Sequence, residues 1–244
     1  IFRAAASTSR RIARNIFATY PRHTPHMLTW SHVNPTWKLH FYDDDACDRF
    51  LREDPEFGDS IHTAYHMLPP GAARADLWRC CVVYRYGGVY VDADCACVVE
   101  LDKLPQMATA CMIVPVDTAQ SQPNAKLALF QAFFAAEQGH AALMRCIQQI
   151  VTNVMTKQHL TNIFMLSGPL CFGRSLNEHY GRAITELWQP FDTTIPDLVL
   201  LFHYVASGIP KNDVIRDAHG RVLVRCQLPI DRSLAADHYN SWSK

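Results

Sequence analysis

Two aspartates, Asp92 and Asp94, stand two positions apart at the end of a short β-prone run, residues 89–91. Alternate side chains of an extended segment face the same way, so the two carboxylates would be aimed at one point. Carboxylates placed in this way repel each other unless a cation lies between them or one of them takes up a proton. A hard divalent cation relieves that repulsion, and such cations also bind substrate phosphates. The pair therefore predicts a divalent metal site, with two acids on a solvated loop as the alternative.

Asp76 and Arg79 form a second candidate pair, three positions apart in a segment with a helical pattern. Residues at that spacing are neighbours on one face of a helix. A guanidinium keeps its charge at any working pH, and its fork of donors suits hydroxyl and phosphate oxygens. The pair predicts a contact to such oxygens, and the alternative is a salt bridge within the helix.

The elements around these residues favour a site at the acid pair. Apolar residues recur at helical spacing through 72–86, and Gly87 and Gly88 then end the helix, as glycine does past a helix C-terminus. The strand that follows, 89–91, leads directly into the two aspartates. In open α/β sheets, ligands bind outside the carboxyl ends of the strands, and the order of these elements places the acid pair there.

Strands and helices alternate along the rest of the chain, which predicts an α/β sandwich. The predicted strands are 13–19, 37–42, 199–204 and 222–226. The predicted helices are 26–33, 46–51, opened by three aspartates at 43–45, and 141–155, while 125–134 is expected to pass from strand into helix.

Length and composition favour one globular domain, since the chain has 244 residues, of which 49% are hydrophobic and 19% charged. Lys plus Arg and Asp plus Glu each number 23, so the formal net charge is zero. That balance argues against nucleic acid as the main partner, because phosphate-backbone binding relies on clustered positive charge. It leaves room for one phosphorylated small molecule.

The chain contains no candidate membrane span, because its longest apolar stretch, 198–205, is interrupted by His203 and is shorter than the about 20 residues required. Nine cysteines cannot all pair, and no Asn-X-Ser/Thr acceptor is present, because Asn34 is followed by Pro35. Both features favour a reducing, cytoplasmic compartment. The alternative is the Golgi lumen with an N-terminal anchor removed, since the chain begins at Ile1.

Residues 71–79 and 84–94 together resemble the sugar-binding Asp-X-Asp region of glycosyltransferase family 32. That family includes fungal initiation-specific α-1,6-mannosyltransferases and relatives of the clostridial glucosylating toxins. Weaker similarities extend over most of the chain, at residues 31–35, 41–44, 139–140, 167–169 and 238–242. The chain departs from the family pattern at 12–17 and at Gln131, where the family has asparagine, and neither departure touches the acid pair.

The resemblance implies a GT-A-like fold, which is a Rossmann-like α/β/α sandwich of a mostly parallel sheet flanked by helices. It implies a single domain over 1–244, with a nucleotide-sugar and metal-binding part at 1–105. The remainder, 106–244, would be the acceptor-side part with a C-terminal donor lid. The cofactor would be Mn²⁺ or Mg²⁺, and the sugar would be transferred with retention at the anomeric carbon.

By the same resemblance, the catalytic residues would be Asp92, Asp94 and Arg79. Asp94 would ligate the metal, and Asp92 would meet the ribose or sugar of the donor as well as the metal. Asp76 and Arg79 would hold the sugar hydroxyls and the diphosphate. Three further donor-binding candidates are Thr19, Tyr20 and Tyr90.

The resemblance also assigns roles outside this region. Tyr20 would stack on the nucleotide base, with a core aromatic as the alternative, and Ser167 and Gly168 would lie on the acceptor side. At the chain end, three residues would complete the donor site, with a frayed tail as the alternative: His238 as a third metal ligand, Ser241 as a hydroxyl to phosphate or metal, and Trp242 as a lid.

These features predict a metal-dependent hexosyltransferase that uses GDP-mannose or a UDP-hexose and a glycan or other hydroxyl acceptor. The alternatives are an inactive nucleotide-sugar or glycan-binding module and a metal-dependent nucleotide-sugar hydrolase. His62 and His66 have the four-residue spacing of a zinc site. No glutamate follows His62 and no third ligand is evident, so they are interpreted as a solvated helical face. The cysteines at 80–81 and 95–97 are interpreted as packing residues.

Overall fold

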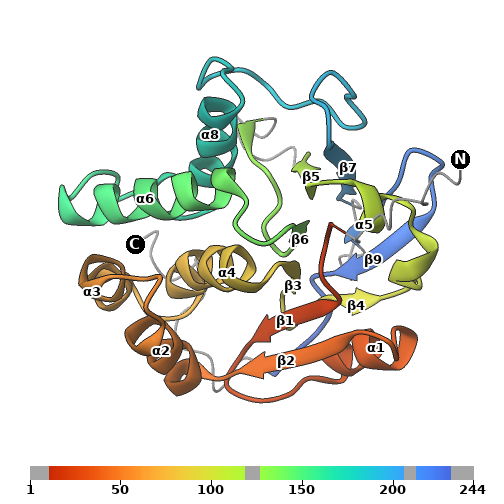
Figure 1. Cartoon of the computed structure of the whole chain (residues 1–244), viewed down its shortest axis with the longest axis horizontal. Coiled ribbons are helices and arrows are strands. Elements are labelled where there is room, and N and C mark those ends of the chain that lie inside the picture. The colour runs from red at the N-terminus through yellow and green to blue at the C-terminus, as the bar shows by residue number, and fades with distance from the viewer. Residues whose placement is uncertain (1–10, 119–126, 206–212, 232–244) are drawn as a thin grey trace, which may run out of the picture.

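The computed structural model describes residues 11–118, 127–205 and 213–231. Within them, a nine-stranded sheet in the order β2-β1-β3-β6-β5-β7-β8-β9-β4 forms the centre of the molecule (Figure 1). The strands are β1 (Asn15–Thr19), β2 (Lys38–Tyr42), β3 (Gly88–Val91), β4 (Ala96–Cys97), β5 (Met112–Asp117), β6 (Phe133–Ala136), β7 (Leu198–Tyr204), β8 (Asp213–Arg216) and β9 (Val222–Cys226).

Helices cover both faces of this sheet, as Figure 1 shows. One face packs against α2 (Asp44–Glu53), α3 (Asp59–Met67), α4 (Ala72–Tyr86), α6 (Ala141–Met155), α7 (Ile163–Leu166) and α8 (Pro169–His179). The other face packs against α1 (Pro25–Val33), the short 3₁₀ helix Leu101–Lys103 and α5 (Gln106–Thr109). This arrangement confirms the predicted α/β/α sandwich.

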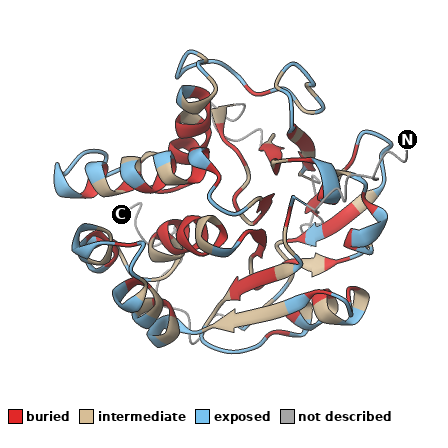
Figure 2. Ribbon diagram, in the orientation of Figure 1, coloured by how far each residue is buried: buried red, intermediate tan, exposed pale blue. Residues whose placement is uncertain are grey.

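Side chains of β3 alternate between the two layers, as the period of a strand requires. Val89 and Val91 pack in the layer of α1, and Tyr90 packs in the layer of α4. Figure 2 shows the result as buried residues through β3 and the middle of β1 and α4, with exposed residues on the outer helices α2 and α3. The Tyr90 side chain therefore lies on the face of the sheet that is covered by α4, the helix that carries Asp76 and Arg79.

Six of the nine strands, β1, β2, β3, β5, β7 and β9, run in the same direction. β6 enters antiparallel between β3 and β5, and β8 and β4 also run against the majority. Most strands of the sheet therefore run in one direction. The adjacent parallel strands β2, β1 and β3 have their carboxyl ends side by side.

Most predicted elements are confirmed within one or two residues, and 141–155 coincides with α6. The interpretation of 125–134 as strand passing into helix is wrong. Its described part contains an isolated bridge between Leu129 and Val116 and the start of β6, and no helix follows before α6. Phe133 and Phe134 pack on opposite faces of the sheet, so the end of this apolar run belongs to a strand that is buried on both faces.

All nine cysteines are free, and eight of them are buried. Burial raises the pKa of Cys81 well above its usual value, which is typical of a thiol that packs as a small hydrophobe. The packing role expected for the cysteines at 80–81 and 95–97 agrees with their complete or near-complete burial. In the ranges described, no helix is long and apolar enough to cross a membrane.

His140 caps the N-terminus of α6, and its Nδ1 atom accepts a hydrogen bond from the backbone N–H of Ala142 at 3.3 Å. Burial, together with the nearby His179, lowers the pKa of His140 from 6.5 to about 4. The unfolded chain therefore binds a proton between pH 6.5 and 4 that the folded chain rejects, so stability falls as the pH is lowered through this window.

His140→Asn should remove this pH dependence, because asparagine keeps a capping acceptor and does not titrate. We expect wild type to lose about 3 kcal/mol more than the variant between pH 7 and pH 4. Urea denaturation of both proteins across this range measures the difference. Parallel stability profiles for the two proteins would contradict the assignment.

Candidate active site

A cavity of about 410 Å³ opens at the carboxyl ends of β1 and β3, beside the N-terminal half of α4. It brings together all seven donor-binding and metal-binding candidates that the structure describes. These are Thr19, Tyr20, Asp76, Arg79, Tyr90, Asp92 and Asp94.

A glycine turn sets the close approach of β3 to β1 at the start of both strands, the end away from the cavity. Gly87 ends α4 with φ at 63°, and Gly88 follows with φ at 132°. Residues other than glycine rarely adopt these backbone angles. A Cβ atom on Gly88 would lie 2.5 Å from the carbonyl oxygen of Asn15, at the start of β1. Glycine at this position therefore lets the two strands pair so that their ends lie side by side.

The guanidinium of Arg79 lies at the centre of the site, and its side chain is only 5% exposed. Its Nη2 atom is 3.3 Å from Asp76 Oδ1 and 3.4 Å from Asp92 Oδ1. Nη1 donates to the carbonyl oxygen of Gln131 at 2.8 Å, and the guanidinium lies 4.5 Å from the centre of the Tyr90 ring. The salt bridge within the helix is thus present, and it belongs to a network that joins α4, the end of β3 and the segment before β6.

Asp76 is fully buried, and both of its carboxylate oxygens are engaged. Oδ2 accepts a hydrogen bond of 3.1 Å from the hydroxyl of Ser167, which is itself buried. Ser167, expected on the acceptor side, therefore lies behind Asp76. Gly168 caps α8, and the next residue, Pro169, reaches the cavity wall.

One carboxylate oxygen of Asp92, Oδ1, contacts both Tyr90 and Arg79. The Tyr90 hydroxyl donates to Asp92 Oδ1 at 2.7 Å, and Arg79 pairs with the same atom. Burial raises the pKa of Tyr90 well above its usual value, so the phenol remains a donor at working pH. The Asp92 side chain is still 32% exposed, which leaves it accessible from the cavity.

The acid pair lies in a turn and not on an extended strand, which corrects the premise of the alternation argument. β3 ends at Val91, and the backbone N–H of Cys95 donates to the carbonyl oxygen of Asp92 at 3.0 Å. The Thr24 hydroxyl, at the start of α1, donates to the carbonyl of Ala93. The N–H of Leu228 donates to the carbonyl of Asp94 at 3.0 Å, so the turn is anchored from two distant parts of the chain.

The two carboxylates that line one cavity fit the donor set of a hard divalent cation. Mg²⁺ and similar ions are usually held by one or two carboxylates together with substrate phosphates. Asp92 and Asp94 supply such oxygens to the lining of the same cavity. The third predicted ligand, His238, lies outside the described residues, as do Ser241 and Trp242.

Thr19 and Tyr20 line the cavity at the end of β1. The Thr19 hydroxyl is 3.2 Å from the sulfur of Cys47, and the Tyr20 hydroxyl donates to the carbonyl of Asp231 at 2.7 Å. Burial raises the pKa of the Cys47 thiol to about 12, so this cysteine is not poised as a nucleophile. Tyr20 is half-buried, and its stacking on a base stays a prediction.

Sequence reasoning assigned no role to several cavity-lining residues, among them Asp44, Cys47, Tyr65 and Arg74. They come from α2, α3 and the start of α4, and only the packing of these helices brings them to the acid pair. Gln131 is 2% exposed, and neither side-chain polar atom has a hydrogen-bond partner among the described residues. Its departure from the family pattern was visible in the sequence, but its burial in the cavity floor was not.

Comparison with known proteins gives matches in sequence and in structure. Residues 22–110 match a family described as glycosyltransferase sugar-binding region containing DXD motif. The initiation-specific alpha-1,6-mannosyltransferase of Candida albicans is 21% identical over 150 residues, which cover 56% of this chain and 39% of that protein. The chain thus matches about two fifths of the length of this relative.

Among solved structures, PaToxG glycosyltransferase matches with a TM-score of 0.54 and 15% identity, over 71% of each chain. The ligand-free glycosyltransferase domain of the YGT toxin matches with a TM-score of 0.41 and 11% identity, over 71% of this chain and 69% of that one. The sequence matches confirm the predicted resemblance to glycosyltransferases with a DXD region. The likeness to PaToxG glycosyltransferase confirms the GT-A-like fold class.

Arg79→Gln should destabilise the protein, because it removes the guanidinium paired with the buried Asp76 carboxylate. Removing one partner of a buried ion pair lowers the free energy of unfolding by about 3 kcal/mol or more. The matched control is Arg145→Gln, which breaks the exposed pair of Arg145 with Glu178 and should change stability by less than about 1 kcal/mol. Equal losses in urea denaturation would show that the Arg79 network does not support the fold.

Proposed function

Since sequence relationship and fold both point to a glycosyltransferase, we propose that this chain moves a hexose from a nucleotide diphosphate sugar to a hydroxyl acceptor. The acceptor is a glycan or another glycoconjugate, and the anomeric configuration is retained. The observation that carries the proposal is the convergence of Asp92, Asp94 and Arg79 on one cavity at the carboxyl end of β3. The name of the C. albicans relative makes mannose, carried by GDP, the first sugar to test, with UDP-hexoses as the second.

Asp94 and Asp92 hold Mn²⁺ or Mg²⁺ in this proposal, and His238 is the third ligand. When bound, the ion supplies charge neutralisation at the diphosphate leaving group. The chain itself adds Arg79, whose charge is fixed and whose position is set by Asp76 and by the carbonyl of Gln131. A preorganised cation in a site closed to water stabilises developing negative charge without reorganising during the reaction.

The remaining residues take the roles that their positions support. Thr19, Tyr20 and Tyr90 line the donor side of the cavity. Ser167 acts through Asp76, and the start of α8 beyond Gly168 forms the acceptor side. Ser241 and Trp242, which lie outside the described residues, are assigned by the family resemblance alone to close over the donor.

The chain works as one catalytic domain in this proposal, with residues 1–105 binding the donor and metal and residues 106–244 forming the acceptor side and a C-terminal donor lid. The pairing of β4 with β9 supports it, because it joins the segment that follows the acid pair to the C-terminal part through one sheet. The hydrogen bond from Leu228 to Asp94 gives the same support.

Nucleotide binding identifies the donor class. A thermal-shift screen of GDP, UDP and their hexose conjugates, with and without Mn²⁺, should show one nucleotide that raises the melting temperature only with the ion. At a hundredfold excess over the dissociation constant, the rise should be about 5–10 °C. No shift with any nucleotide would contradict the proposal and favour an inactive glycan-binding module.

Asp94→Asn should lower hexose transfer on the order of 100-fold or more, because it removes a charged oxygen from the proposed metal site. Asp45→Asn, the same change on the exposed first turn of α2, is the control and should leave transfer unchanged. Near-normal transfer by Asp94→Asn would refute the metal assignment. Donor breakdown that an added acceptor does not accelerate would identify a hydrolase instead.

A further inference from the structure

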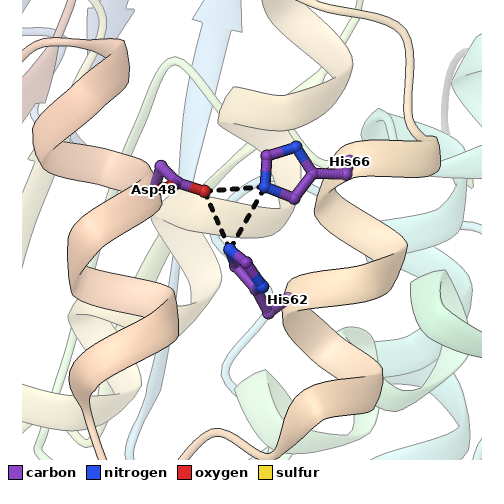
Figure 3. Close-up of side chains that lie close together, drawn as sticks. All are labelled: Asp48, His62 and His66. Atoms are coloured by element: carbon purple, nitrogen blue, oxygen red, sulfur yellow. Dashed lines mark hydrogen bonds and ion pairs between the residues drawn. The ribbon is translucent and has the colours of Figure 1, made fainter.

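Three potential metal ligands converge on the outer surface of α2 and α3, away from the acid pair. Figure 3 shows the carboxylate of Asp48 on α2 facing the imidazoles of His62 and His66, which lie one turn apart on α3. Asp48 Oδ1 is 2.8 Å from His62 Nε2 and 2.7 Å from His66 Nε2, and the two nitrogens are 3.1 Å apart. The interpretation of the two histidines as a plain solvated face lacked a third ligand, and the packing of α2 on α3 supplies it.

Hydrogen bonds alone do not account well for this triangle. Each Nε2 atom carries either one proton or one lone pair in the ring plane. If both nitrogens donate to the single oxygen Asp48 Oδ1, two N–H groups face each other at 3.1 Å and neither accepts. Three lone pairs that point to one centre are instead what a metal ion requires.

The spacing suits an ion of the size of zinc. Zinc lies about 2.0–2.1 Å from imidazole nitrogen and from carboxylate oxygen in tetrahedral sites, so its ligand atoms lie about 3.3 Å apart. The three distances in the cluster, 2.8, 2.7 and 3.1 Å, are shorter than this by roughly 0.2 to 0.6 Å. The His66 side chain is 50% exposed and that of His62 is 27% exposed, so small rotations of the two rings can widen the triangle to fit an ion.

The surroundings orient the carboxylate for this role. Arg52, one turn after Asp48 on α2, donates from Nη1 to the other carboxylate oxygen, Oδ2, at 3.3 Å. A ligating carboxylate is usually hydrogen-bonded in this way through the oxygen that does not face the metal. The exposure of His66 leaves a path for the ion and room for a water molecule as a fourth ligand.

We propose that Asp48, His62 and His66 form a zinc-binding site that is separate from the Asp92–Asp94 region. Two imidazoles and one carboxylate are a donor set that favours zinc over the hard ions expected at the acid pair. This assignment is independent of the proposed transferase activity, because it uses none of the cavity residues.

The bound ion clamps α2 to α3. Each helix also supplies a cavity residue next to a ligand, since Cys47 precedes Asp48 and Tyr65 precedes His66. The clamp therefore secures the part of the cavity wall that α2 and α3 supply. Because an ion that binds only the folded chain stabilises it, zinc raises the melting temperature.

The test uses the full chain after chelator treatment and dialysis. Zinc at a hundredfold excess over its dissociation constant should raise the melting temperature by about 5–10 °C. Calorimetric titration should give one zinc per chain, and Co²⁺ should give the intense visible absorption of a tetrahedral site. His66→Gln, at the most exposed of the three ligands, should lose all three signals, and Asp48→Asn should weaken them.

Two controls separate this site from other metal binding. His32→Gln changes an exposed histidine on α1 and should leave zinc binding intact, as should Asp94→Asn at the acid pair. Thiolate charge-transfer bands in the Co²⁺ spectrum would assign the ion to cysteines and overturn the proposal. Zinc binding by His66→Gln equal to wild type, or no zinc-dependent shift in wild type, would also overturn it.

Discussion

The burial of one cation, the guanidinium of Arg79, constrains the rest of the candidate site. A charge removed from water is tolerated only where counterions and hydrogen-bond acceptors surround it. Here those groups come from α4, from the turn after β3 and from the backbone before β6. Three segments that are separate in the sequence are thereby fixed relative to one another. The cavity wall is consequently built before any ligand arrives, which is the condition under which electrostatic stabilisation is most effective.

The two sites differ in the chemistry of their ligands, and each agrees with its place in the fold. The acid pair lies in a turn just after the carboxyl end of β3. Backbone hydrogen bonds hold this turn, and both residues line the cavity. The cluster of Asp48, His62 and His66 lies on the surfaces of two helices, where side chains one turn apart can converge. Oxygen ligands beside a cavity suit an ion shared with a substrate, and imidazoles on an outer surface suit a structural ion.

Local patterns were sufficient for the elements whose periodicity and end signals agree. α4 was predictable from its spacing and from Gly87, and α6 from an apolar stripe of fifteen residues. The same reasoning failed where contacts distant in sequence decide. The turn at 92–95 depends on Thr24 and on Leu228, and Asp76 is held by Ser167, ninety-one positions away. A short apolar run such as 125–134 carries no periodicity that separates a buried strand from a helix.

The link between β4 and β9 has a consequence for how the protein forms during synthesis. The acid pair leaves the ribosome long before the strand that pairs with the segment after it, and before Leu228, which anchors its turn. Contacts between such distant segments form slowly, because a long loop must close first. The active centre is thus assembled late, and its formation depends on the C-terminal strands as much as on the segment that carries the motif.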